Sequence, residues 1–129
     1  MNSSFNPTQI LTGPPGVIVH GTENTAPAAA TVLADSLALT PGTYLVYAGV
    51  ASTDTAANII QVAHRNAANN ADVELADSQS GVLAGGPQGE LGLLGWFVIS
   101  NSGERVVVRN KNAGTAALFY QADLYLWRY

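Results

Sequence analysis

Apolar and polar positions alternate with a period of two in several separate segments, which is typical of β-strands and not of helices. Gly, Asn and Pro stand between the segments and favour turns there. No internal repeat of about 20–50 residues is present. The predicted strands are residues 17–20, 28–39, 43–52, 58–65, 72–76, 91–100, 105–110 and 116–129.

Three further features of this pattern affect the prediction. Residues 28–39 also permit a helical turn or two, but their β-branched residues and flanking prolines favour a strand. Residues 72–76 alternate apolar with acidic side chains, which predicts an edge strand with one wet face. Residues 78–90 are rich in Gly and Ser, and the Gly-rich run at residues 85–89 predicts a loop.

Residues 43–52, 91–100 and 116–129 are apolar on both faces. In the last of them, Leu124 points one way and Trp127 points the other. A strand that is apolar on both faces must be covered on both faces. One cover is the core of the domain, and the other is a second sheet, a second subunit or a ligand. We interpret the second face of residues 116–129 as a subunit contact.

The strand pattern predicts an all-β fold, an antiparallel jelly-roll sandwich of about eight strands. It occupies residues 17–129, and residues 1–16 form an extended arm because proline is dense there. Two interpretations of the arm stay open. It is either a loose terminus or a segment that lies along a neighbouring protein through Phe5, Ile10 and Leu11.

The composition excludes several classes of function. Charged residues make up 11% of the chain, against roughly 25% in ordinary domains, so much of the surface is neutral and suits burial in an assembly. The other interpretation is a plain surface that the net charge of −4 keeps soluble. Five basic residues against nine acidic ones argue against nucleic-acid binding. There is no apolar run of about 18 residues for a membrane span, no cysteine, and no signal-peptide pattern at the start.

No catalytic or cofactor motif is recognisable. His20 and His64 stand on separate strands, without the spacing that a metal site needs, and His64 is predicted to be a surface or interface histidine. Asp72 and Glu74 share a strand face, but paired acids on an edge strand serve solubility. We therefore expect no enzyme activity, no cofactor and no metal.

The aromatic side chains carry the remaining signal. They either stack on sugars or fill the core and a subunit interface, where aromatics are enriched. We favour the interface. The predicted trimer-interface residues are Tyr44, Tyr47, Phe119, Tyr125, Trp127 and Tyr129.

Three segments resemble the trimeric jelly roll shared by tumour necrosis factor and the globular heads of complement-type collagenous proteins. Residues 41–50 begin Pro-Gly-Thr-Tyr and resemble its "Pro-Gly-x-Tyr" strand. Residues 91–99, followed by 102–108, resemble its long strand and "Gly-Asp-x-Val" hairpin, with Glu104 where Asp is usual. Residues 119–129 resemble its closing strand, which lies at the three-fold axis.

The same trimeric fold occurs in decoration, or cement, proteins on the capsids of tailed bacteriophages, which this chain is similar to in its low charge and proline-bearing arm. The resemblance implies a homotrimer that binds the major capsid protein and stabilises the shell, made in the host cytoplasm and located on the virion. No nucleic-acid or membrane partner is expected. Two alternatives stay open. One is the head of a phage fibre or tail protein that binds a host-cell glycan, which predicts aromatic, Asp and Asn side chains in exposed loops at one end. The other is a small-ligand or enzyme jelly roll.

Overall fold

The computed structural model describes residues 15–54, 56–66, 72–73, 79–83, 89–114 and 119–129. These residues form strands and turns, and none of them forms a helix that is long and apolar enough to cross a membrane. The strands are β1 (Val17–His20), β2 (Asn24–Thr25), β3 (Val32–Asp35), β4 (Gly42–Ser52), β5 (Asn58–Arg65), β6 (Asp72–Val73), β7 (Gln79–Leu83), β8 (Gly89–Ile99), β9 (Arg105–Asn110) and β10 (Phe119–Arg128).

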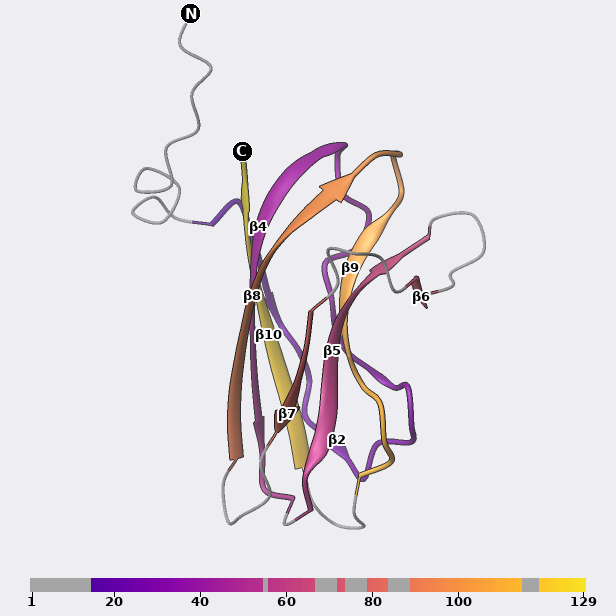
Figure 1. Cartoon of the computed structure of the whole chain (residues 1–129), viewed down its shortest axis with the longest axis vertical. Helices are drawn as coiled ribbons and strands as arrows, with labels where there is room; N and C mark the ends of the chain where they lie inside the picture. Colours follow the sequence, from indigo (N-terminus) through magenta and orange to yellow (C-terminus); the bar gives the residue numbers. More distant parts are fainter. Residues whose placement is uncertain (1–14, 55, 67–71, 74–78, 84–88, 115–118) are drawn as a thin grey trace, which may run out of the picture.

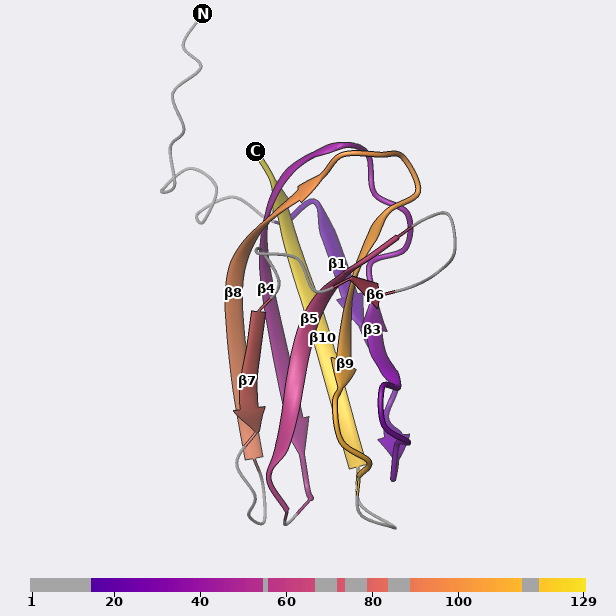
Figure 2. The same cartoon turned by 45° about the vertical axis from the view of Figure 1, so that its right-hand side comes forward.

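The strands form two antiparallel sheets that pack face to face (Figures 1 and 2). The first sheet has the order β1-β10-β4-β8, and β2 also pairs with β10. The second has the order β3-β9-β5-β6, and β7 also pairs with β5. Setting the two-residue strands β2 and β6 aside, the first sheet holds the first, eighth, third and sixth strands, and the second holds the others. This is the strand order of a jelly roll, so the predicted fold class is confirmed.

Period-two alternation decides which side chains enter the core. In β4 and β10 the even-numbered residues point between the sheets, and Leu124 and Leu126 are fully buried there. In β8 the odd-numbered residues do so, among them Phe97 and Ile99. The second sheet contributes Ile60, Val62, Val106 and Val108 from β5 and β9. These five strands therefore each direct one face into the core between the sheets, as a sandwich requires.

Several predicted strands match the structure closely. Strands β1, β5 and β9 have the predicted bounds, and β4 begins one residue earlier than predicted. Strand β6 covers only the first two residues of the predicted edge strand, and residues 74–76 lie outside the described part.

No strand was predicted within residues 78–90, and the structure has strand residues there in two places. Of the predicted loop at residues 85–89, only residue 89 is described. Residues 79–83 form β7, which pairs with β5 over five positions, and residues 89–90 belong to β8. Gly81 has low strand propensity, but the side chains of Leu91 and Leu93 lie so close to it that an added Cβ would meet them at 3.0–3.3 Å. Packing between β7 and β8 thus overrides the weak local preference.

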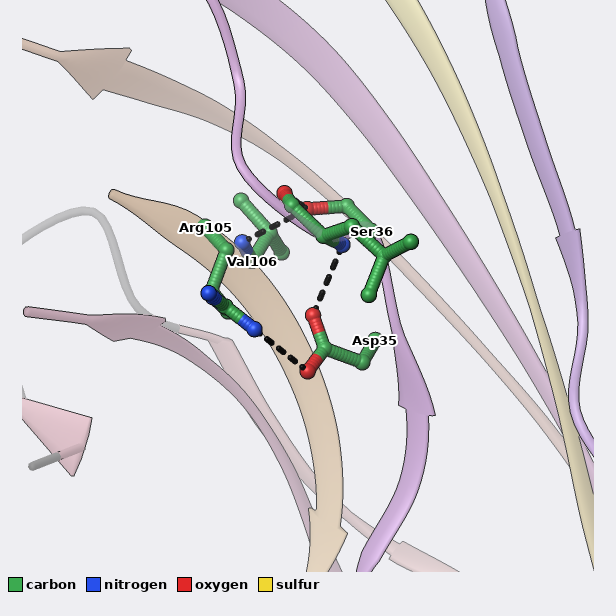
Figure 3. Close-up of polar contacts among 5 residues, drawn as sticks. Asp35, Ser36, Arg105 and Val106 are labelled. Atoms are coloured by element: carbon green, nitrogen blue, oxygen red, sulfur yellow. Dashed lines mark hydrogen bonds and ion pairs between the residues drawn. The ribbon is translucent and has the colours of Figure 1, made fainter. Parts of the chain in front are cut away.

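Residues 28–39 contain a strand, as favoured, but β3 is shorter than predicted. Ala30 and Leu37 adopt left-handed backbone angles, each with φ of 62°, on either side of it, and such angles end a strand. After β3, the Asp35 carboxylate accepts hydrogen bonds from the backbone N–H of Leu37 and from the Arg105 guanidinium at 3.3 Å (Figure 3). The Ser36 hydroxyl accepts the N–H of Val106 (Figure 3). These side chains tie the end of β3 to β9.

Candidate interaction face on the first sheet

The outer face of the sheet β1-β10-β4-β8 carries its side chains in rows across the strands. One row aligns Trp127, Leu45 and Trp96 through the pairing of β10, β4 and β8. The next row aligns Ile18, Tyr125, Tyr47 and Leu94. Facing strand residues in one row stand on the same side of a sheet, so these side chains are neighbours.

These two rows, together with Thr43, Val98 and Tyr129 beyond them, form what we call the apolar patch. It contains no charged side chain. Leu94, Val98 and Ile18 are each more than half exposed. By contrast, Leu45 is only 5% exposed because it lies between the two indoles. Contiguous exposed apolar surface of this kind marks interaction sites.

The structure places four of the six predicted trimer-interface residues on this face: Tyr47, Tyr125, Trp127 and Tyr129. The prediction for Tyr44 is wrong. Tyr44 and Tyr47 are an odd number of residues apart on one strand, so they point to opposite faces. Tyr44 lies in the core at 4% exposure, and its hydroxyl donates to the Thr40 carbonyl at 2.6 Å. For Phe119 only the backbone is described, paired with Thr25.

The sequence analysis did not assign Ile18, Leu94, Trp96 or Val98 to the interface. The sequence does indicate the three β8 residues, because residues 91–100 are apolar on both faces. What was missing was the pairing of β8 with β4, which places Trp96 beside Leu45. The predicted arm residues Phe5, Ile10 and Leu11 lie outside the described part of the chain.

Beyond the apolar patch the same face becomes polar and hollow. The next row aligns Asp123, Gly49 and Gly92, so two of its three strands offer no side chain. The result is a groove of about 370 Å³ at the end of the sheet where β4 ends and β8 and β10 begin, the lower end in Figure 1. Its walls are Tyr47 and Tyr125 on one side and Glu90, Gln121 and Asp123 on the other.

Tyr47 is held beside this groove by the glycine of the neighbouring strand. A Cβ added at Gly92 would stand 2.6 Å from the Tyr47 hydroxyl, so the ring lies across a position that only glycine leaves open. The ring centroids of Tyr47 and Tyr125 are 6.2 Å apart, with the planes tilted by 41°. The glycines inside these strands are the feature of the sequence that could have indicated this groove, because they leave part of a sheet face without side chains.

Asp123 lines the groove, and His20 stands next to it on β1. Their Nδ1 and Oδ1 atoms are 3.4 Å apart, and His20 meets Tyr125 edge to face with ring centroids 6.3 Å apart. The Asp123 Oδ1 atom is buried and has no hydrogen-bond partner. In the part of the chain that the structure describes, no group of three His, Asp or Glu side chains is placed to hold a metal ion.

The other polar groups of interest lie inside the sandwich. His64, predicted to be a surface or interface histidine, is 4% exposed because it points into the end of the core, and its Nε2 is 3.3 Å from Glu104. Glu104 accepts hydrogen bonds from the backbone N–H groups of Asn101 and Ser100. The N–H of Asn101 is the main reason that the pKa of Glu104 lies below its ordinary value; burial acts against it.

No family model and no curated protein sequence matches this chain. Solved structures do match it in fold. One, titled "CBM4 structure and function", has a TM-score of 0.54 and 15% sequence identity, over 92% of this chain and 81% of that one. At this identity the match supports the fold alone.

Two further structures are similar over most of their length. The tumour necrosis factor Eiger of S. frugiperda has a TM-score of 0.49 and 17% identity, over 89% of this chain and 93% of that one. Murine APRIL at pH 8.0 has a TM-score of 0.47 and 15% identity, over 84% and 98%.

Proposed function

We propose that this protein is a structural protein that self-associates into a trimer through the apolar patch, and that the trimer decorates a phage capsid. The observation that carries the proposal is the patch itself. Ile18, Leu94 and Val98 are more than half exposed there, beside two indoles and without a charge. When a second copy covers this apolar surface, water is excluded from it and the free energy of the system falls.

The composition supports assembly. With charged residues at 11%, the chain relies on few charges for solubility, and the patch adds an apolar area to that surface. Jelly rolls are a common architecture of viral capsid domains. In a trimer that holds three equal contacts to a capsid, multivalency would turn modest single contacts into tight attachment.

The fibre-head alternative placed its aromatic side chains in exposed loops at one end of the molecule. The structure has Tyr47, Trp96, Tyr125 and Trp127 on strands of one sheet instead. The loop version of that alternative therefore has no support from the described residues.

Self-association is tested by sedimentation equilibrium and native mass measurement at micromolar concentration. We expect a species of three times 13.4 kDa. Leu94→Glu introduces a charge into the patch and should weaken association by about 100-fold or more, because the charge would be buried without a partner. The matched control is Val82→Glu, which changes an equally exposed residue on β7 of the other sheet and should leave the trimer intact.

A wild-type monomer at this concentration would overturn the proposal, and a dimer would overturn the trimer. If Val82→Glu disrupted association as strongly as Leu94→Glu, the contact would not be through the apolar patch.

Capsid decoration is tested separately, by mixing the trimer with undecorated phage capsids and measuring bound protein. Saturable binding is expected. A variant that lacks residues 1–16 should lose capsid attachment and keep the trimer, if the arm clamps the shell. Absence of saturable binding, with an intact trimer, would reject the decoration role and leave self-association standing.

A further inference from the structure

We infer that the groove beside the apolar patch binds a neutral sugar, with one pyranose ring against Tyr47 and Tyr125 and its hydroxyls on Glu90, Gln121 and Asp123. This inference goes beyond the trimer and the capsid and concerns the single chain. Tyr47 and Tyr125 also belong to the apolar patch, so a sugar and a second copy would compete for these two rings. Its basis is the chemistry of the groove walls, taken one wall at a time.

The first wall is aromatic and fixed. Tyr47 lies across Gly92, and Tyr125 is braced by His20 from the opposite strand, so both rings have defined positions before a ligand arrives. Rigid aromatic side chains bind flat apolar surfaces at low cost in conformational entropy. The C–H face of a pyranose ring is such a surface.

The second wall consists mainly of hydrogen-bond acceptors. Glu90 and Asp123 are carboxylates, and an ionised carboxylate accepts hydrogen bonds but donates none. The Gln121 amide donates one Nε2 proton to the Gly21 carbonyl at 3.2 Å, which leaves the amide oxygen as an acceptor and the second Nε2 proton as a donor. Most of the polar atoms of this wall are acceptors, and sugar hydroxyls supply donors at the edge of the ring.

The size and floor of the groove fit a small ligand. Its volume of about 370 Å³ lies at the lower end of small-molecule sites. Gly49 and Gly92 keep the floor free of side chains. A second hollow of about 270 Å³ shares Glu90 and Gln121 and extends toward Glu23, which gives room for a further sugar unit.

The charge of the groove favours a neutral sugar over an acidic ligand and over a cation. Among the residues that the structure describes, no Lys or Arg lines the groove, so an acidic sugar or a phosphate would face two carboxylates without a counter-charge. A cation would gain little, because Glu90 is exposed and ion pairs at exposed sites are weak. A cation would also use only the acceptor wall, whereas a neutral sugar uses both walls.

The test is a titration of ¹⁵N-labelled protein with the methyl glycosides of glucose, galactose, mannose and fucose. At least one glycoside should shift the amide signals of Gly49 and Gly92 saturably at millimolar concentration. Methyl glucuronide and N-acetylarginine amide serve as the acidic and cationic probes. We expect saturable shifts with a neutral glycoside and no saturable shifts with either of these two probes.

Variants locate the site. Glu90→Gln and Gln121→Ala should each weaken binding by about 2- to 10-fold, the value of one hydrogen bond. Gly49→Val fills the floor, where an added Cβ meets nothing closer than 3.6 Å, so the fold should persist while binding is lost. The control is Gly16→Val at the start of the edge strand, where the nearest atom to a Cβ is 4.0 Å away.

Three results would overturn the inference. One is the absence of saturable shifts with all four neutral glycosides. Another is tighter binding of the arginine or glucuronide probe than of any neutral glycoside. The third is unchanged glycoside binding by a folded Gly49→Val protein.

Discussion

Tyr120 shows how a single polar group is held in the core of this sandwich. Its side chain is fully buried, and its hydroxyl donates to Asp54 at 2.8 Å and accepts from Asn58 at 3.1 Å. Asn58 in turn donates to the Asn112 carbonyl. Burial is the main cause of the raised pKa of Tyr120, and the hydrogen bond to Asp54 adds to it. Together these bonds join β10, β5 and two loops.

Tyr120→Phe should lower the free energy of unfolding by about 1–3 kcal/mol, because the buried Asp54 carboxylate loses a donor. A group whose pKa is raised by folding stabilises below its unfolded pKa, about 10 for tyrosine, and loses this as the pH rises through the folded pKa. The gap between wild type and variant in urea unfolding should therefore shrink above pH about 10. A gap that stays the same above this pH would contradict the role of the Tyr120 hydroxyl.

Glu104 should affect stability at low pH, whereas Tyr120 affects it at high pH. Its pKa is lowered, so its stabilising effect is present above its ordinary pKa of about 4.3 and is lost as the pH falls through the folded value. Glu104→Gln keeps an acceptor for Ser100 and Asn101 but removes the charge, which should cost about 1 kcal/mol at pH 7. Urea unfolding at several pH values checks this. Glu23→Gln is the exposed control, and a gap that does not narrow at low pH would be inconsistent with the lowered pKa.

At the scale of elements, the close approach of the chain after β1 to β3 of the second sheet requires the glycine at position 21. Its N–H donates to the Ala122 carbonyl at 2.8 Å, and its Cα faces the carbonyl of Leu33 on β3. An added Cβ would lie 2.5 Å from the Ala122 oxygen and still closer to the Leu33 oxygen. Both are backbone atoms, which cannot move away as a flexible side chain does.

Gly21→Ala should therefore destabilise the protein by about 1–3 kcal/mol through overpacking, although alanine has the better strand propensity. Thermal unfolding measures the loss. Gly16→Ala, five residues earlier, meets no atom closer than 4.0 Å and should be neutral. A neutral Gly21→Ala would mean that β1 and β3 do not approach as closely as described.

The sequence predicted elements best where alternation was long. Residues 58–65 and 105–110 were placed with the correct bounds because their β-branched residues leave no helical alternative. It failed at residues 79–83, where Gln, Ser and Gly carry no strand signal and the strand exists because β5 and β8 hold it. Pairing partners are tertiary facts, so alternation could not have found β7.

At the scale of the whole molecule, self-association and stability are linked. A partner that binds only the folded state raises its apparent stability by mass action. The apolar patch is exposed in the single chain, and the trimer we propose would cover it.

The melting temperature should therefore rise with protein concentration for the wild type and stay constant for Leu94→Glu, measured by calorimetry over about a 100-fold range of concentration. Val82→Glu should behave as the wild type does. A melting temperature that does not depend on concentration in the wild type would contradict obligate self-association.

The sequence by itself determined the fold class, the parity of each long strand and the presence of a second apolar face on three of them, because a period of two fixes which side chains share a face. It also determined that few charges and no metal-ligand spacing compete for that face. Only the tertiary structure decided which strands are neighbours. That pairing turned Tyr44 inward with the core, aligned Trp127, Leu45 and Trp96 in one row, and set Gly49 beside Gly92 to open the groove. Rows across a sheet depend on register between distant segments, and no local pattern contains it.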